Sequence, residues 1–298
     1  MNRFFWLAIA LILLGLFWLK KKNKKAQVEG SEWPSRTWDK KSLENKLFLA
    51  DPWEVASWLT GTFTAREDLW PELKEVLQKS GLEGVLIGAL TSGTEKQMLA
   101  VKTLGLIGSQ ASLPVLVQTL GSKDDELSLE AMEALKKLRL PESGELLLNA
   151  LITGKGALPS RCAHVLISLG SLVQGSILKA LPQVPDVYKP LLIEILGEMK
   201  EEKVLPSLIP YLKSGQSLVR QKTVQAFGLA GSPSVCKYLL PLLEDEDWKV
   251  RAEAAKVLGE LGCGEAVDQL KRLCADSSWH VQVNAREALT ELGVSLED

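Results

Sequence analysis

The sequence predicts an all-α fold: an α-solenoid of about seven two-helix repeats, preceded by one transmembrane helix. Hydrophobic residues recur in two ladders that share a period of 30 or 31 residues. Within each period they are spaced three and four apart, as on one face of a helix. An uninterrupted apolar run near the N-terminus predicts the membrane helix. These patterns divide the chain into residues 1–19, 20–45, 46–82 and 83–298.

Residues 1–19 are the predicted transmembrane anchor. Residues 4–19 carry no charged side chain, and as a helix they reach about 24 Å, slightly less than a hydrocarbon core of about 30 Å. Aromatic residues at both ends suit the headgroup zone. A cleaved signal peptide is the alternative, and it needs basic residues before the apolar run and small ones after it. Here only Arg3 precedes the run and KKKNKK follows it, which favours a retained signal anchor.

Charge predicts the orientation of this anchor. Residues 1–30 hold six basic residues and one acidic residue, a net charge of +5, and the remaining 29 basic and 36 acidic residues give −7. Basic flanks stay in the cytoplasm, so the five lysines after the run predict a single-pass protein of the cell membrane, with a cytoplasmic body and its N-terminus outside. A body at −7 argues against a general nucleic-acid or anionic-membrane surface.

The next two segments connect the anchor to the repeats. Residues 20–45 are polar and basic and predict a tether, and residues 46–82 predict a Trp-rich helical N-terminal cap. Asp51-Pro52 suits a helix start. The tryptophans either fill the open end of the first repeat or line a pocket for a ligand or partner, and the sequence leaves both interpretations open. Five of the nine lie here: Trp33, Trp38, Trp53, Trp58 and Trp70.

Residues 83–298 contain the repeats, each with a helix A and a helix B. Neither helix can bury its apolar face alone, so neighbouring repeats must stack. Asp124, Asp247 and Ser278 suit the N-cap of helix B, and a Gly closes most repeats. The helix A ladder is Leu90, Leu120, Leu151, Leu181, Leu212, Leu243 and Leu273, and the helix B ladder is Leu104, Leu135, Leu166, Leu196, Phe227, Leu258 and Leu289.

The repeat DWKVRAEAAKVLGELG (247–262), echoed by LVRQKTVQAFGLAG (218–231), resembles the short HEAT repeats of the bilin-lyase-like (PBS lyase HEAT-like) type. The resemblance covers roughly residues 83–298 and implies an armadillo-type superhelix. It implies little about chemistry, because that group includes scaffolds, bilin lyase subunits and a di-iron hydroxylase. Arg220 and Arg251 resemble the structural Arg that bonds across neighbouring helices of such repeats.

The residues that could carry chemistry are few. The two histidines, His164 and His280, are each followed by Val, so the His-Glu pairs of the hydroxylase members are absent. We expect His164 on the solvent side of its helix and His280 in the turn before its helix. No phosphate loop, dinucleotide fingerprint or nucleophile elbow is present. We therefore expect no catalytic residue, cofactor, metal or small-molecule substrate.

The four cysteines form no CxxC pair, and reduced buried thiols are their expected state. Cys162 falls where equivalent repeats have Ala, which predicts a small core residue. Cys263 and Cys274 are close in sequence but lack the further ligands of a zinc site, and Cys236 is the fourth.

On helix B, positions −9, −5, −2 and +2 from the ladder residue point away from the core. Ten residues at these positions are acidic and six are basic. Such a face repels phosphates and suits a protein partner with a basic segment, although a merely solvated face is the alternative. The predicted partner-binding residues are the clustered acids and nearby apolar residues: Glu126, Glu130, Glu133, Glu253, Glu260, Glu287, Glu291, Leu191, Leu218 and Leu229.

The sequence thus predicts a membrane-anchored cytoplasmic scaffold that mediates protein–protein interaction without catalysis. The alternative is an enzyme or lyase subunit of the bilin-lyase-like group.

Overall fold

The structure is a computed structural model that describes residues 47, 50–61, 70–92 and 96–295. The predicted anchor at 1–19 and tether at 20–45 lie outside these residues, as do Trp33 and Trp38. None of the helices in the described ranges is long and apolar enough to cross a membrane. Every regular element in these ranges is helical, and the chain divides into two units, Met1–Leu138 and Arg139–Asp298.

The first unit contains two helices, α3 and α4, followed by two helix pairs. The first of these helices begins at Asp51-Pro52 as predicted, since the Asp51 carboxylate accepts a hydrogen bond from the Trp53 N–H at 2.9 Å and Pro52 opens the helix. Trp58 is buried, and its helix packs against the first B helix. The described helices are α3 (Pro52–Gly61), α4 (Trp70–Lys79), α5 (Leu82–Ser92), α6 (Gln97–Ile107), η3 (Gln110–Ser112), α7 (Leu113–Thr119) and α8 (Asp125–Leu138).

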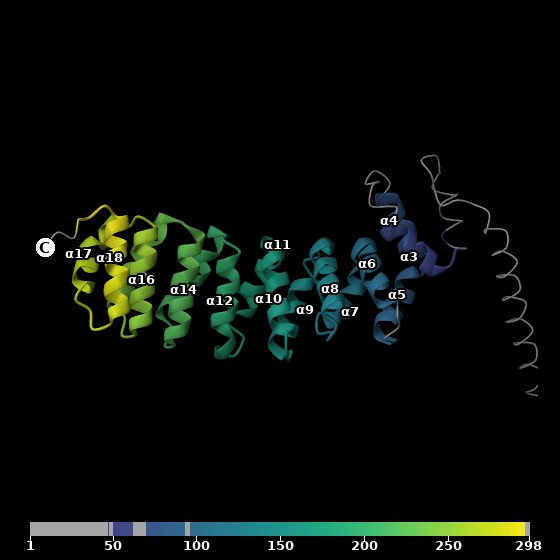
Figure 1. Ribbon diagram of the computed structural model, residues 1–298, viewed down its shortest axis with the longest axis horizontal. Helices are drawn as coiled ribbons and strands as arrows, with labels where there is room; N and C mark the ends of the chain where they lie inside the picture. The colour runs from purple at the N-terminus through teal and green to yellow at the C-terminus, as the bar shows by residue number, and fades with distance from the viewer. Residues whose placement is uncertain (1–46, 48–49, 62–69, 93–95, 296–298) are drawn as a thin grey trace, which may run out of the picture. The chain divides into compact units, whose positions relative to one another are not determined.

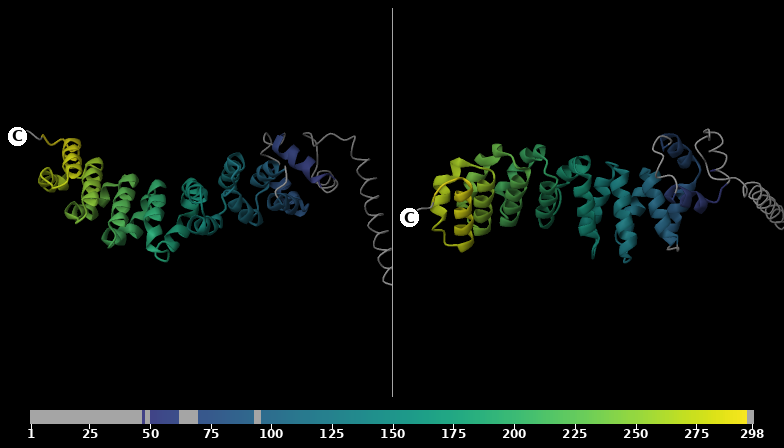
Figure 2. Two further views of the ribbon diagram at one scale, coloured as in Figure 1. Left: turned by 60° about the horizontal axis from the view of Figure 1, so that its bottom comes forward. Right: turned by 45° about the horizontal axis from the view of Figure 1, so that its top comes forward.

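The second unit contains five helix pairs, in which the B helices α12, α14, α16 and α18 lie side by side in chain order (Figures 1 and 2). Its elements are α9 (Ser143–Thr153), α10 (Leu158–Leu169), α11 (Ser171–Ala180), η4 (Asp186–Tyr188), α12 (Lys189–Glu198), η5 (Glu202–Val204), α13 (Leu205–Leu208), η6 (Ile209–Lys213), α14 (Ser217–Ala230), η7 (Pro233–Val235), α15 (Cys236–Leu239), η8 (Leu240–Glu244), α16 (Trp248–Glu260), η9 (Gly264–Ala266), α17 (Val267–Leu273) and α18 (Trp279–Glu291).

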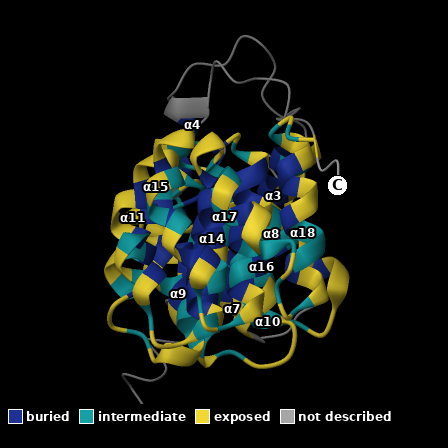
Figure 3. Cartoon of the chain, turned by 90° about the vertical axis from the view of Figure 1, so that its left-hand side faces the viewer, coloured by how far each residue is buried: buried dark blue, intermediate teal, exposed yellow. Residues whose placement is uncertain are grey.

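The two units therefore hold the seven predicted helix pairs, and the predicted ladders form their cores. The helix B ladder from Leu104 to Leu289 is fully buried, and the helix A ladder is buried from Leu90 to Leu243. Figure 3 shows buried residues between the helices and exposed residues on their outer sides. Each unit thus has the side-by-side helix pairs of an α-solenoid.

Two A helices depart from the prediction of one continuous α-helix. In these repeats a four-residue α-helix, α13 or α15, passes into a 3₁₀ helix, η6 or η8. Pro210 and Pro241 are the second residues of the two 3₁₀ helices. Proline lacks the N–H that an α-helix would bond four residues back, so the α-helical ladder stops there.

Neighbouring B helices approach closely at a glycine that follows the ladder residue. A Cβ built on Gly197 would lie 2.9 Å from Ala226, and one built on Gly259 would lie 2.6 Å from Ala288. Carbon atoms in ordinary van der Waals contact are 3.5–4.0 Å apart. These positions therefore need glycine because of the approach of the next helix.

Most ends of the B helices follow the predicted signals; Ser278 occupies the N-cap position of α18, but its side chain makes no capping hydrogen bond. The Asp247 carboxylate accepts a hydrogen bond from the Lys249 N–H at 2.8 Å, and Asp124 accepts from two N–H groups of α8. After α14 the backbone turns at Gly231 with φ 69°. Two repeats place a larger residue at this left-handed position, Arg139 with φ 47° and Lys200 with φ 53°. A side chain is strained in that conformation.

The predicted structural role of the two arginines is confirmed. Arg220 of α14 donates to both oxygens of Asp245 at 2.7 Å and to the Ser214 carbonyl at 2.7 Å. Arg251 of α16 makes the same paired contact with Asp276 at 2.9 Å. Each pair is nearly buried and ties a B helix to the segment before the next B helix.

The prediction that all four cysteines are reduced thiols is wrong. Cys236, at the start of α15, and Cys263, after α16, form a disulfide with their Cα atoms 5.9 Å apart. Cys236 is the first residue of one short A helix and Cys263 precedes the A-helix segment of the next repeat, and only stacking of those repeats brings them together. Cys162 is confirmed as a core residue: it is fully buried, and burial raises the pKa of its thiol to about 12.

Candidate functional site

The outward side of the last four B helices carries most of the predicted binding residues. We call this surface the B face; its sixteen side chains come from the segment before α12 and from α12, α14, α16 and α18. They are Val187, Leu191, Glu194, Glu198, Leu218, Lys222, Gln225, Leu229, Lys249, Glu253, Lys256, Glu260, His280, Asn284, Glu287 and Glu291.

The predicted apolar residues differ in exposure on this face. Leu218, near the start of α14, is 52% exposed, and Leu229, at its other end, is 38% exposed. Leu191 of α12 is half-buried. Two leucines of α14 are therefore open to a partner, whereas Leu191 offers only part of its side chain.

The predicted acids of the last two repeats come together on α16 and α18. Glu260, Glu287 and Glu291 are exposed, and Glu253 is half-buried. The Glu253 carboxylate accepts a hydrogen bond from the Gln225 amide at 2.9 Å, so it also links α14 to α16.

Pairing within the B face leaves an excess of negative charge. Lys222 pairs with Glu194 at 2.9 Å, and Lys256 lies 3.6 Å from Glu260. For Glu287 and Glu291 the described part of the chain supplies no ion pair. Six carboxylates against three ammonium groups therefore leave the face acidic, and its exposed carboxylates without an ion pair include those of Glu287 and Glu291 on α18.

The remaining predicted acids, Glu126, Glu130 and Glu133, form a separate set on α8 of the first unit. Glu126 is exposed, and the other two are half-buried. Lys102 lies 3.9 Å from Glu130, and Lys136 pairs with Glu133 at 2.9 Å. This set is thus more fully neutralised than the carboxylates of α18.

An exposed aromatic cluster at the starts of α16 and α18 escaped the sequence reasoning. Trp248 is 39% exposed and Trp279 is 67% exposed. The His280 ring stacks on Trp248 with a centroid distance of 5.1 Å and meets Trp279 edge to face at 5.2 Å. The Lys249 ammonium lies 5.7 Å from the Trp248 ring centroid. The signal was available, because the two tryptophans are one repeat apart at the same helix position.

The histidines are exposed in different settings. His164 lies on the solvent side of α10, as predicted. His280 is the second residue of α18, so its predicted place in the turn before the helix is wrong; the helix starts earlier because Ser278 is its N-cap residue. Within the described ranges, no group of three His, Cys, Asp or Glu residues could hold a metal ion.

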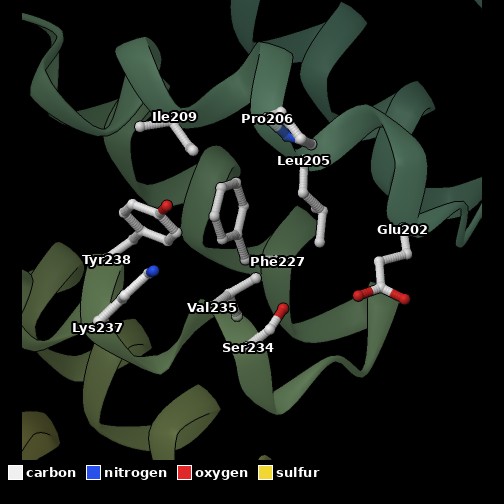
Figure 4. A pocket seen from close by; sticks show the side chains of 9 residues that line it. All are labelled: Glu202, Leu205, Pro206, Ile209, Phe227, Ser234, Val235, Lys237 and Tyr238. Carbon is white, nitrogen blue, oxygen red and sulfur yellow. The ribbon is translucent and has the colours of Figure 1, made fainter.

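A small pocket lies between two successive A-helix segments (Figure 4). Its volume is about 290 Å³. Phe227 of α14 forms its centre and is fully buried, while Glu202 lies at one end and Lys237 with Tyr238 at the other. The Glu202 carboxylate also accepts a hydrogen bond from the Ser232 hydroxyl at 2.5 Å. The pocket thus combines an apolar middle around Phe227 with charged side chains at its two ends.

Comparisons with known proteins identify the repeat type. A model of HEAT repeats matches residues 85–166 and 237–297. No curated protein sequence matches the chain. Among solved structures, one engineered protein is 18% identical, covering 86% of this chain and 84% of its own, with a TM-score of 0.40. A second engineered protein is 20% identical, and the match covers 82% of this chain and 97% of the engineered protein, with a TM-score of 0.30.

Human deoxyhypusine hydroxylase in complex with glycerol is 17% identical to the chain. That match covers 81% of this chain and 97% of the hydroxylase, with a TM-score of 0.36. Similarities at this level support no argument about function. The all-helical fold and the matched residues lead to one conclusion: this chain contains HEAT repeats, over residues 85–166 and 237–297.

Proposed function

We propose that this protein is a membrane-anchored, cytoplasmic, non-catalytic HEAT-repeat scaffold that binds a protein partner through a Lys- or Arg-containing segment. The observation that carries the proposal is the B face, where open carboxylates of α18 accompany exposed apolar side chains of α14. The period of 30 or 31 residues also favours the short, bilin-lyase-like type of repeat.

The chemistry of the B face favours a protein over other partners. Its excess carboxylates repel phosphate, which disfavours nucleic acid and anionic lipid. Exposed apolar side chains supply affinity when they are buried by a partner, and surrounding charges steer the encounter. A partner segment with basic residues meets both requirements. The acids Glu126, Glu130 and Glu133 of α8 offer such a segment a separate, weaker area on the first unit.

Residues 4–19 supply the proposed anchor. Two features, the disulfide and the lysine cluster after the anchor, favour opposite sides of the membrane for the repeats. Disulfides persist in oxidising compartments, and Cys236 is bonded to Cys263. The five lysines of residues 20–25 act earlier, because charge bias orients an anchor during insertion, before the repeats fold. We therefore place the repeats in the cytoplasm, a reducing compartment that does not favour the disulfide.

Partner capture tests the role of the B face. Epitope-tagged protein is purified from membranes, and the captured proteins are identified by mass spectrometry. Reversing Glu253, Glu260, Glu287 and Glu291 to Lys should abolish capture of the partner and leave the helical circular-dichroism signal intact.

A matched control makes the same change of charge on the A-helix side of the second unit, at Glu201, Glu244, Glu265 and Asp268. These side chains lie in or beside η5, η8, η9 and α17, away from the B face. The control should keep the partner. Equal capture by the wild type and both folded variants would remove the acidic B face from the binding site.

Protease accessibility tests the orientation. Protease added outside intact cells should leave the repeats uncut, because residues 20–298 are proposed to face the cytoplasm. Permeabilised cells provide the control in which the repeats are cut. Cleavage in intact cells would overturn the cytoplasmic placement and favour the oxidising compartment that the disulfide suits.

A further inference from the structure

Exposed apolar and aromatic side chains follow one another along the starts of the last four B helices. Val187 is 74% exposed before α12, Leu218 is 52% exposed on α14, and Trp248 and Trp279 open α16 and α18. With His280, which touches both tryptophans, they form what we call the apolar row. The first four residues are separated by 31, 30 and 31 positions, so each repeat contributes one of them at nearly the same place.

Contacts between adjacent helices make the row continuous. His280 of α18 stacks on Trp248 of α16. The start of α16 meets the start of α14, since the Ser217 hydroxyl donates a hydrogen bond to Asp247, which lowers the pKa of that carboxyl. Farther along, Lys222 of α14 pairs with Glu194 of α12. These contacts join α12, α14, α16 and α18 in chain order, and side-chain contact within the row itself joins Trp248, His280 and Trp279.

The spacing along the row favours an extended partner. Packed helices are about 8–10 Å apart, so successive anchors of the row repeat at that distance. A polyproline II chain advances about 3.1 Å per residue with three residues per turn, so every third side chain lies on the same face at intervals of about 9 Å. In a β-extended chain the side chains alternate between two faces, so every third one would point away from the row. On a partner helix, side chains of one face recur at about 5–6 Å, so every second one would miss an anchor.

We propose that the apolar row binds a segment of a partner protein in the extended polyproline II conformation, with an apolar residue at every third position and Lys or Arg between them. This proposal rests on the proposed function and specifies the conformation and pattern of the partner segment. The apolar residues contact Leu218, Trp248 and Trp279 in turn. The basic residues face the carboxylates beside the row, among them Glu246, which has a side chain 84% exposed and lies 3.3 Å from the Arg220 guanidinium.

Charge around the row agrees with a basic partner. The carboxylates of Glu246 and Asp247 lie at the start of α16, next to the row, and Glu287 and Glu291 lie farther along α18, more than two helical turns from Trp279. The one ammonium group within the row, that of Lys249, is held over the Trp248 ring. A partner cation beside the aromatic cluster therefore meets the carboxylates at the start of α16.

The test uses the full chain in detergent micelles and two fluorescein-labelled twelve-residue peptides of the same composition. One has the sequence Leu-Pro-Arg repeated four times, and the other contains the same residues with the leucines grouped together. Fluorescence anisotropy should show that the regular peptide binds about tenfold more tightly than the grouped one. Equal affinity, or no binding of the regular peptide, would overturn the proposal.

Variants locate the peptide on the protein. Trp279→Ala should weaken binding of the regular peptide about tenfold, and Leu218→Ser should also weaken it. Both side chains are more than half exposed, so these changes leave the fold intact. Leu129→Ser, on α8 of the first unit, is the matched control, since Leu129 is 58% exposed and lies outside the row. The control should bind like the wild type.

Native partner capture separates this proposal from the proposed function. Loss of the partner on reversal of the B-face acids, with full capture by Trp279→Ala, would remove the apolar row alone. Full capture by both would remove the scaffold proposal as well. Loss in both variants, with the tenfold effects on the peptide, supports the row as the site of the partner segment.

Discussion

The close approach of α16 and α18 leads to a sharp prediction for Gly259→Ala. A Cβ on Gly259 would lie 2.6 Å from both Cα and Cβ of Ala288 and 2.7 Å from the Glu291 carboxylate. The Ala288 Cα is a backbone atom of α18 and the Ala288 Cβ is bonded directly to it. Neither atom can move aside as the end of a long side chain can. The two helices must therefore separate by about 1 Å to restore ordinary contact.

The expected cost follows from two opposing effects. Forcing extra volume into a packed interface costs about 1–3 kcal/mol. Alanine in the middle of a helix is more favourable than glycine by about 0.5–1 kcal/mol, which offsets part of that cost. We expect Gly259→Ala to lower the free energy of unfolding by about 1–2 kcal/mol.

Gly175→Ala is the matched control, because Gly175 lies in the exposed middle of α11 and an added Cβ would meet nothing within 4 Å. It should gain about 0.5–1 kcal/mol from helix propensity alone. Urea denaturation followed by far-ultraviolet circular dichroism measures both variants. The same substitution should thus move the transition in opposite directions, and stabilisation by Gly259→Ala would refute the close packing of α16 on α18.

Four further predictions concern stability and use the same assay. Leu258→Ala removes a fully buried side chain and should cost about 2–5 kcal/mol, and a loss below about 0.5 kcal/mol would place Leu258 outside the core. Lys200→Gly relieves a left-handed backbone at φ 53° and should stabilise by about 0.5–1 kcal/mol, whereas destabilisation would contradict that strain. Reduction of the disulfide, whose cysteines are 27 residues apart, should cost about 3–4 kcal/mol, and an unchanged transition would show that the bond adds no stability. The hydrogen bond from Arg251 lowers the pKa of the Asp276 carboxyl, so this pair stabilises the fold above a pH of about 4 and ceases to do so as the pH falls further. Asp276→Asn should therefore be less stable than the wild type at neutral pH, and its free energy of unfolding should fall less on acidification.

Much of the fold was predictable because a repeat displays the same physical requirement many times. The ladder residues around Leu104 and Leu258 recur at one period, and each is buried as expected. N-caps such as Asp247 and the left-handed Gly231 depend on local hydrogen bonding and local backbone freedom, which short stretches of sequence reveal. Arg220 and Arg251 were placed correctly because their position within the repeat is constant.

The candidate site was predicted less completely. Helix periodicity identified Leu218, Glu287 and Glu291 as outward-facing, and all three are exposed. Periodicity could not predict how exposed each outward residue is, because exposure also depends on the neighbouring helix. Leu191 also occupies an outward position of its helix, yet it is half-buried. The Trp248–His280 stack joins residues of two repeats, and neither residue alone predicts it.

The period and polarity of the sequence thus sufficed to predict the helix pairs, their buried faces and their acidic outward side. Each of these features depends on residues three or four positions apart. Contacts between repeats depended on how closely one helix approaches the next. That distance brings Cys236 to Cys263, makes Gly259 irreplaceable beside Ala288 and aligns the apolar row across four helices. Such pairs are about 30 residues apart in sequence, and only their packing in three dimensions makes them neighbours.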